Sequence, residues 1–172
     1  QALEAPLPIP VVWNTGGYDR VETSRPWKGK STSISPTTST PTPRGQGLRR
    51  GGRLPGGGPG GIQEMVRQTG PTSWTGTVCS GRGVVIRHLL LPGRLAQAKE
   101  VMDWVAGTFP PGTVLFSLMS QYTPWGRAAA FPPLDRPCGR ARSAGRSNTW
   151  PTWGWRLHPG GGGGEGRVYS RL

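Results

Sequence analysis

Cysteine is scarce in this chain of 172 residues, which contains only Cys79 and Cys138. The two lie in unrelated contexts, so neither a disulfide framework nor a zinc-binding spacing can be built from them. No long apolar run is present either: the longest, near residues 84–91, is interrupted by polar side chains and is too short to span a bilayer. The start lacks a basic region followed by an apolar stretch, so we expect no signal peptide, no membrane partner and a cytoplasmic location.

Apolar and acidic residues are also in short supply. Hydrophobic residues make up 33% of the chain, whereas glycine and proline supply 29 and 19 residues. Such a composition buries too little apolar surface to offset conformational entropy, which is typical of low-complexity or disordered sequence. With 21 basic and 8 acidic residues the net charge is +13, which by itself favours nucleic acid or an anionic surface as partner.

The positive charge is confined to two segments. Residues 24–61 contain seven Arg or Lys and no acidic residue, and residues 136–172 contain seven Arg and one Glu, so together they account for the whole net charge of +13. Residues 1–23 and 62–135 hold seven basic and seven acidic residues and are neutral. We therefore expect the two neutral parts to fold, and the two basic, low-complexity parts to be long, disordered Gly/Pro/Arg-rich segments.

The first neutral part and the beginning of the second carry short periodic patterns. Residues 8–14 are typical of a buried strand that ends in a polar residue, and Thr15 is a candidate cap for a helix beginning near Tyr18. Residues 62–69 place their apolar side chains on one helical face and are followed by the stop signal Gly70-Pro71.

The remainder of the second neutral part predicts a strand–helix–strand unit. Residues 83–91 are nearly continuous in apolar side chains, as in a parallel strand that is covered on both faces. Apolar residues spaced three and four apart predict a helix over residues 95–106, capped by Gly107, and residues 113–119 form the next strand. Together these patterns indicate an α/β fold with a parallel sheet.

Polar side chains follow three of the predicted strands. They are Asn14, the pair Arg87 and His88, and the run Ser120-Gln121-Tyr122. Ligands of parallel sheets bind outside the carboxyl ends of the strands, so these residues are the candidate site.

Four blocks of the sequence, in order, resemble one family. They are residues 12–18 (Val-Trp-Asn-Thr-Gly-Gly-Tyr), 64–68 (Glu-Met-Val-Arg-Gln), 87–93 (Arg-His-Leu-Leu-Leu-Pro-Gly) and 117–124 (Ser-Leu-Met-Ser-Gln-Tyr-Thr-Pro). Each is weak alone, but their order and spacing are similar to those of radical S-adenosylmethionine proteins of the pyruvate formate-lyase activating enzyme kind. The blocks cover roughly the two neutral parts.

The resemblance implies a fold, cofactors and a partner. The fold would be an incomplete partial (β/α)-barrel. The parent protein would cleave S-adenosylmethionine reductively at a 4Fe-4S cluster and abstract a hydrogen atom, with a glycyl-radical enzyme or another protein as its substrate. Three thiolates hold such a cluster, and the family supplies them from a Cys-x-x-x-Cys-x-x-Cys motif upstream of the first block. This chain contains no such motif. We therefore expect an inactive fragment, with no catalytic residue and no metal ligand.

The candidate residues each have two interpretations. The resemblance implies that Asn14 lines the cofactor or substrate pocket, although it could instead cap a turn. Arg87 could bind the cofactor carboxylate or reach solvent at a strand edge. For His88 the two interpretations are cofactor binding and a half-buried imidazole whose hydrogen bonds are satisfied within the chain, and the second is favoured. Side chains of neighbouring strand residues point to opposite faces, so only one of Arg87 and His88 can face the barrel interior. Gln121 and Tyr122 could bind substrate or close a loop.

A shift of reading frame would explain the basic segments. Between the first two blocks the family has a strand ending in an aspartate-x-lysine motif, where this chain has Ser and Thr. Read one nucleotide out of register, the codons of residues 27–40 can spell Leu-Glu-Gly-Glu-Val-Asp-Ile-Tyr-Leu-Pro-Asp-Tyr-Lys-Tyr, with the motif's aspartate and lysine at the codons of Thr37 and Ser39. The same shift gives residues 148–155 a helical pattern. Our hypothesis is that residues from about 25 to 61 and from about 137 onward are frameshifted translations.

The alternative is a basic, disordered nucleic-acid-binding protein. Arg/Gly-rich segments such as residues 49–53 bind RNA through phosphate contacts and guanidinium stacking. The absence of aromatic residues from 41–61 weighs against this interpretation.

Overall fold

The structure is a computed structural model that describes residues 9–17, 19–38, 58–74, 80–138, 149–150, 155–157 and 166–171. Most of the Arg/Gly-rich tract on which the nucleic-acid alternative depends lies outside the described residues, as do Tyr18, Ser39 and Cys79. Within the described part of the chain, no helix is long and apolar enough to cross a membrane.

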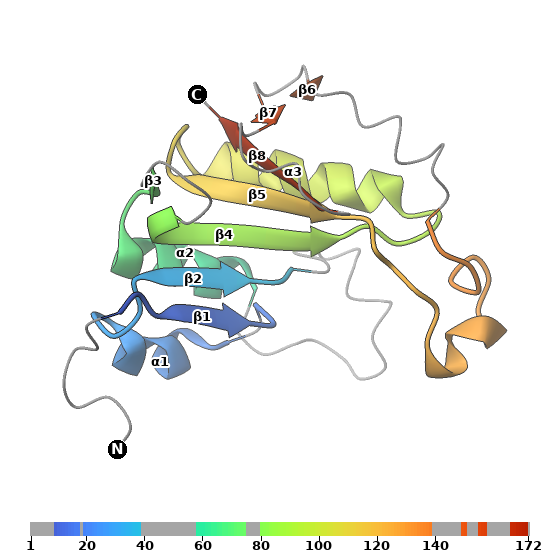
Figure 1. Cartoon of the computed structure of the whole chain (residues 1–172), viewed down its shortest axis with the longest axis horizontal. Helices are drawn as coiled ribbons and strands as arrows, with labels where there is room; N and C mark the ends of the chain where they lie inside the picture. Colours follow the sequence, from blue (N-terminus) through green and yellow to red (C-terminus); the bar gives the residue numbers. More distant parts are fainter. Residues whose placement is uncertain are drawn as a thin grey trace.

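Four parallel strands form the centre of the molecule (Figure 1). They are β1 (Val12–Thr15), β2 (Ser33–Pro36), β4 (Ser80–Leu89) and β5 (Val114–Met119). They lie side by side in the order in which they occur along the chain. The short strand β3 (Ser73–Trp74) pairs antiparallel with the beginning of β4.

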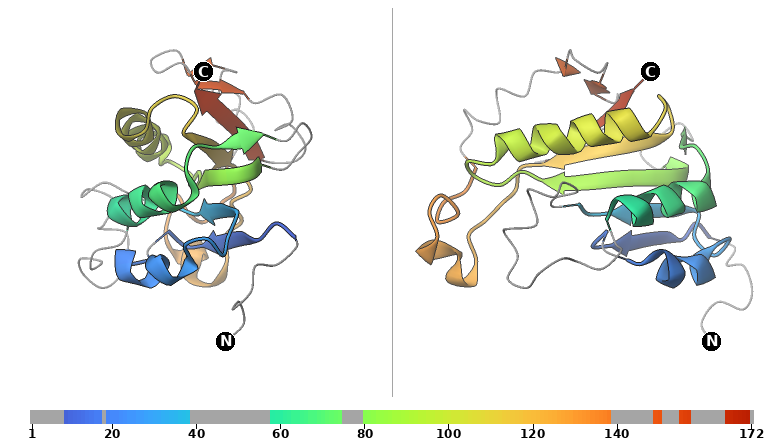
Figure 2. Two further views of the ribbon diagram at one scale, coloured as in Figure 1. Left: turned by 90° about the vertical axis from the view of Figure 1, so that its left-hand side faces the viewer. Right: turned by 180° about the vertical axis from the view of Figure 1, so that it is seen from behind.

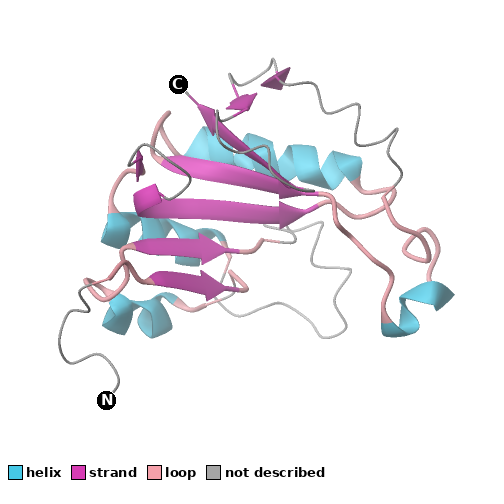
Figure 3. Ribbon diagram, in the orientation of Figure 1, coloured by secondary structure: helices cyan, strands magenta, loops and turns pink. Residues whose placement is uncertain are grey.

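The helices alternate with these strands and cover one face of the sheet (Figures 2 and 3). They are α1 (Val21–Ser24), which continues into the 3-10 turn η1 (Arg25–Trp27), α2 (Pro59–Thr69) and α3 (Leu95–Thr108). A second 3-10 turn, η3 (Gly126–Ala130), follows β5 at the carboxyl end of the sheet. The fold is therefore α/β, as the sequence predicts.

The hydrophobic core lies between the sheet and these helices. Ile86 of β4 and Phe116 of β5 are fully buried. They belong to one apolar cluster with residues of both long helices, among them Ile62, Met65 and Met102. Burying one side chain of this size contributes about 1.5–3 kcal/mol, so the cluster is the main source of stability in this part of the chain.

The predicted helices and strands of the second neutral part are confirmed, with shifted ends. The helix predicted over 62–69 begins earlier, at Pro59, whose fixed backbone angle suits the first helical turn. The helix predicted to end at Gly107 continues to Thr108 and is capped by Phe109, whose N–H bonds to the carbonyl of Val105. Phe109 is buried in the core and packs edge-on against Trp104, which explains why the helix continues past the glycine.

The cap predicted for a helix near Tyr18 is wrong. The helix begins at Val21, and no side chain caps it. Thr15 closes the preceding turn instead, because its hydroxyl oxygen accepts a 3.3 Å hydrogen bond from the N–H of Gly17 and its O–H donates to the carboxylate of Asp19.

The prediction that the basic segments hold no regular element is wrong for several residues. Strand β2 lies within the segment 24–61, and three further strands, β6 (Thr149–Trp150), β7 (Trp155–Leu157) and β8 (Gly166–Arg171), lie within 136–172. Strand β8 pairs antiparallel with β5 and continues the sheet through β7 and β6. The physical reason is that the hydrogen bonds between strands are made by backbone N–H and C=O groups. Every residue other than proline has both groups, so a segment without a strand pattern in its side chains can still pair.

A polar cluster joins α2 to the end of α1. The carboxylate of Glu64 accepts two hydrogen bonds from Arg67, at 2.6 and 2.7 Å, and one from the amide nitrogen of Gln68 at 2.9 Å. The hydrogen bond from Arg67 is the largest cause that lowers the pKa of Glu64 to about 2. Gln68 also donates to the carbonyl oxygen of Ser24 at 3.1 Å and so connects α2 to the last residue of α1.

Candidate functional site

The carboxyl ends of the four parallel strands bring several of the predicted polar residues to one edge of the sheet. Side chains alternate between the two faces of a strand. Ile86 and His88 of β4 are buried on the side of the helices, so Arg87 between them lies on the opposite face. We call this opposite face, which none of the described helices covers, the helix-free face.

Arg87 is the centre of the polar groups on the helix-free face. Its Nη2 donates a hydrogen bond to the side-chain oxygen Oδ1 of Asn14, at the end of β1, and another, of 2.7 Å, to the hydroxyl oxygen of Thr37, just after β2. Backbone pairing places these residues together, because Thr37 forms a parallel bridge with Arg87 and Ser117 of β5 stands in register on its other side. Three neighbouring strands thus contribute to one cluster.

The guanidinium of Arg87 is incompletely satisfied. Its Nε is buried and has no hydrogen-bond partner among the described residues. The ion pairs formed within the described part of the chain join Arg67 to Glu64 and Arg136 to Asp135, so neither neutralises Arg87. A half-buried cation with a free donor attracts a carboxylate or another oxyanion.

The loop after β1 closes over the same edge. Gly17 has a φ of +72°, and a Cβ atom at this position would lie 2.6 Å from the carbonyl oxygen of Thr37. Only glycine combines this backbone conformation with so close an approach. The N–H of Thr37 in turn bonds to the carbonyl of Thr15 at 2.8 Å, which fixes the end of β2 beside the loop.

His88 lies on the other side of the sheet and belongs to the core. It is 3% exposed, and its Nδ1 donates a 2.7 Å hydrogen bond to the carbonyl oxygen of Thr38. Burial lowers the pKa of His88 below its usual value, and the hydrogen bond to Thr38 opposes this effect. The interpretation of His88 as a satisfied imidazole fits this geometry, and the structure does not bring it together with Asn14 and Arg87 on the helix-free face.

The two predicted substrate-binding residues follow β5. Gln121 is exposed. Tyr122 is half-buried and donates a 2.8 Å hydrogen bond from its hydroxyl group to the carbonyl oxygen of Leu134, which closes the loop that contains η3. The hydroxyl of Tyr122 is thus engaged within the chain, in accordance with the loop-closing interpretation.

No protein-family model matches the chain, and neither a curated protein nor a solved structure is significantly similar to it.

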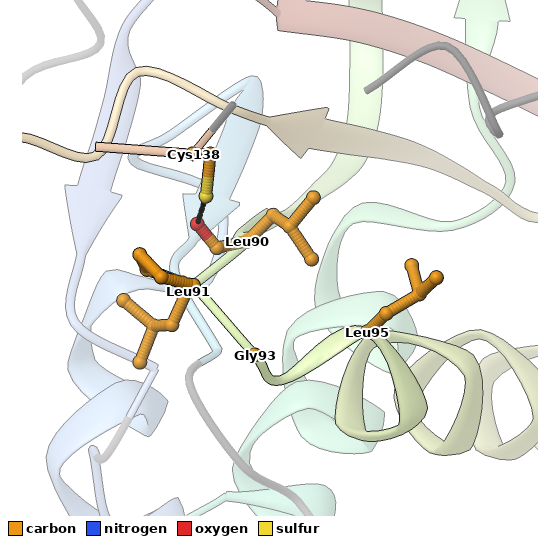
Figure 4. A pocket seen from close by; sticks show the side chains of 6 residues that line it. Leu90, Leu91, Gly93, Leu95 and Cys138 are labelled. Atoms are coloured by element: carbon orange, nitrogen blue, oxygen red, sulfur yellow. Dashed lines mark hydrogen bonds between the residues drawn. The ribbon is translucent and has the colours of Figure 1, made fainter. Parts of the chain in front are cut away.

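A small apolar pocket lies beyond the end of β4 (Figure 4). Its volume is about 200 Å³, and it is lined by Leu90, Leu91, Pro92, Gly93, Leu95 and Cys138. The thiol of Cys138 donates a 3.2 Å hydrogen bond to the carbonyl oxygen of Leu90. The pocket offers no charged side chain to a ligand, so it differs in chemistry from the cluster around Arg87.

The donor set of this chain does not fit an iron–sulfur cluster. A 4Fe-4S cluster of the kind implied by the resemblance requires three thiolates, whereas the sequence contains two cysteines. Among the described residues, no three Cys, His, Asp or Glu side chains come together as metal ligands. The polar cluster around Arg87, by contrast, contains a guanidinium, whose charge and planar N–H groups suit a carboxylate.

Thr37 is the member of the cluster to which the sequence pattern gives no role. A threonine in a Ser/Thr-rich tract carries no recognisable signal, and its partner Arg87 is 50 residues away along the chain. The only indication in the sequence is the shifted reading frame, which places the aspartate of the family motif at this codon.

Proposed function

We propose that this chain is a fragment of a cytoplasmic radical S-adenosylmethionine protein similar to the pyruvate formate-lyase activating enzymes, and that it does not itself carry out their reaction. The parent protein acts on a glycyl-radical enzyme or another protein substrate. The fragment retains part of the surface that faces the cofactor, but not the ligands of the iron–sulfur cluster.

The arrangement of the sheet supports this proposal. Its four parallel strands follow one another in chain order, and the connecting helices lie on one face. Successive βα units of a barrel have this arrangement, with the helix-free face turned to the interior. A doubly wound sheet has helices on both faces and reverses its strand order at a switch point. The described strands therefore favour an incomplete barrel over a doubly wound domain.

The observation that carries the proposal is the cluster of Arg87 with Asn14 and Thr37. It lies on the helix-free face at the carboxyl ends of the strands, which is where barrel enzymes bind their ligands. When bound, S-adenosylmethionine supplies the radical chemistry and carries an amino acid group with a free carboxylate. Arg87 would attract that carboxylate through the positive charge of its guanidinium, and Asn14 would orient the guanidinium from the side.

Anaerobic reconstitution with iron and sulfide tests the inactive state of the chain. We expect the purified chain to take up no stoichiometric iron, to show no iron–sulfur absorbance and to form no 5′-deoxyadenosine from S-adenosylmethionine. A known activating enzyme treated in parallel is the positive control. Stoichiometric iron with turnover would overturn the proposal that the chain is inactive.

The encoding nucleotide sequence tests the family. We expect the three cysteine codons of the Cys-x-x-x-Cys-x-x-Cys motif upstream of the first block. We also expect the shifted reading frame to be free of stop codons across the codons of residues 25–61 and from 137 onward. Stop codons in that shifted frame would exclude the frameshift hypothesis.

A further inference from the structure

A short turn joins α1 to β2 and carries basic residues together with an exposed tryptophan (Figure 1). We call residues 25–30, Arg-Pro-Trp-Lys-Gly-Lys, the tryptophan turn. It comes just before β2 in the chain, whereas Thr37 of the cluster around Arg87 comes just after β2. The tryptophan turn therefore lies at the opposite end of this strand from the candidate site, and the proposed function makes no use of it.

The backbone of the tryptophan turn is well defined. The N–H of Lys28 bonds to the carbonyl oxygen of Arg25 at 3.1 Å, and the N–H of Lys30 bonds to that of Trp27 at 3.0 Å. Lys28 has a φ of −55° and a ψ of 125°, and Gly29 has a φ of +76°, which are angles of a type II turn. Residues three apart lie close together in such turns. Arg25 is thus held near Lys28, and Lys30 near Trp27.

Trp27 is an aromatic platform with a support behind it. Its ring stacks on that of Trp13, with centroids 5.4 Å apart and an angle of 23° between the planes. Trp13 belongs to β1 and packs against the apolar core. Although one face of its ring is covered, Trp27 is still 37% exposed. A nucleic-acid base can extend such a stack, because every base has a flat π face.

The cations of the tryptophan turn are available to an anion. Arg25, Lys28 and Lys30 are exposed, and the ion pairs formed within the described part of the chain involve none of them. No acidic residue occurs between residues 24 and 61. A basic surface with an exposed aromatic ring among its charges is the arrangement by which proteins bind single strands, since the cations contact phosphates while the ring stacks on a base.

We propose that the tryptophan turn binds single-stranded nucleic acid, with a base stacked on Trp27 and phosphates bound by its cations. In a duplex the bases are stacked on one another and offer no free face to the indole. An anionic membrane would attract the lysines, but it has no flat ring for Trp27. The inference concerns the chain as it stands, whatever reading frame the parent gene uses. It differs from the Arg/Gly-rich alternative, because an aromatic side chain stands among the cations.

Fluorescence anisotropy with the full chain tests the stacking contact. The probes are a labelled single strand of about 12 thymidine nucleotides and an abasic strand of the same length, which keeps the phosphates but lacks the bases. We expect Trp27→Ala to raise the Kd for the thymidine strand about tenfold, because one stacking contact is lost, and to change the Kd for the abasic strand little. The control is Trp125→Ala, which removes an exposed tryptophan outside the turn and should leave both Kd values unchanged.

The phosphate contacts are tested with two double variants of equal charge. One combines Lys28→Gln with Lys30→Gln, and the other combines Lys99→Gln with Arg127→Gln, which are exposed residues elsewhere in the chain. We expect the slope of log Kd against log salt concentration to fall by about 1.4 for the first variant, because each phosphate contact on a single strand contributes about 0.7. The slope should stay nearly unchanged for the second variant.

Three results would overturn the proposal. Equal losses of affinity in the two double variants would mean that net charge alone attracts the strand. Equal affinity of the native chain for the thymidine and abasic strands would exclude base stacking. Binding to phosphatidylserine vesicles in preference to the thymidine strand, abolished by Lys28→Gln with Lys30→Gln, would assign the turn to a membrane surface. If Trp27→Ala lowers the urea midpoint, Trp27→Phe keeps an aromatic ring and should recover most of the affinity.

Discussion

The two inner strands β4 and β2 are neighbours in the sheet but are stabilised in different ways. Strand β4 pairs with β5 over six consecutive residues, from Val84 with Val114 to Leu89 with Met119, and its inward side chains belong to the apolar core. Strand β2 has four residues, of which two pair in register with β4, and its sequence is Ser-Ile-Ser-Pro. Only Ile34 of β2 enters the core cluster.

Polar contacts replace apolar packing in β2. The hydroxyl of Ser33 donates to the carbonyl oxygen of Gly83 at 3.2 Å, the N–H of Thr38 donates to the carbonyl of Arg87 at 2.7 Å, and the carbonyl of Thr38 accepts from His88. The difference teaches that a sheet can include a segment whose side chains carry no strand signal, provided that its neighbours supply backbone partners on both sides. Truncations should therefore affect the two strands very differently.

The largest effect is expected from Phe116→Ala in β5, the neighbour of β4. Phe116 is fully buried in the core, so its truncation removes apolar contacts and leaves a cavity. We expect the free energy of unfolding to fall by about 3–5 kcal/mol, as measured by urea denaturation. The control is Trp125→Ala, which removes a side chain that is 90% exposed and should leave the midpoint nearly unchanged. Similar losses for both variants would show that the core is not formed as described.

A smaller effect is expected in β2 from Ser33→Ala. This change removes the buried hydrogen bond to Gly83 but little apolar surface, so we expect a loss of about 1 kcal/mol in the same assay. The matched control is Ser35→Ala, because Ser35 is half-buried and its hydroxyl makes no hydrogen bond within the described residues. A loss for Ser33→Ala as large as that for Phe116→Ala would contradict the distinction between the two strands.

The same distinction explains what could be predicted from the sequence. The helix and strands between residues 83 and 119 are predictable because apolar spacing reports directly on which side chains face the core. Strand β2 is not predictable in this way, since it is defined by pairing with residues far along the chain, such as Ser33 with Gly83. Its pattern of serine and proline favours a loop when read locally.

The candidate site was predictable only in part for a related reason. Strand alternation predicts that Arg87 and His88 face opposite sides, but it cannot tell which side the helices cover. That choice depends on the packing of Ile86 and its neighbours against α2 and α3. Thr37 joins Arg87 through a bridge between β2 and β4, which no local pattern contains.

The junction of the two strands gives the last prediction, which concerns pH. His88 of β4 is buried, and its imidazole donates to the carbonyl of Thr38 just beyond β2. Burial lowers its pKa below the ordinary value of 6.5, so the folded chain keeps the imidazole neutral at pH values where the unfolded chain already binds a proton. The stability contributed by the neutral His88 is therefore fully present above pH 6.5. It is lost as the pH falls through this value towards the lower pKa that His88 has in the folded chain.

We expect the urea midpoint of the native chain to fall between about pH 7 and pH 5, while the fall is smaller for His88→Leu, which cannot be protonated. Acid changes the protonation of one side chain at this junction and removes no apolar contact. We therefore expect the loss of stability in acid to be smaller than the losses caused by Phe116→Ala and Ser33→Ala. An equal fall for both proteins would place the responsible group elsewhere. A midpoint that rises in acid would mean that His88 is stabilised in its charged form and would contradict its burial. If the urea midpoint falls in acid for the native chain but not for His88→Leu, the neutral imidazole stabilises the junction of β2 and β4. The apolar side chains that pair between β4 and β5, such as Ile86 and Phe116, carry no group that titrates.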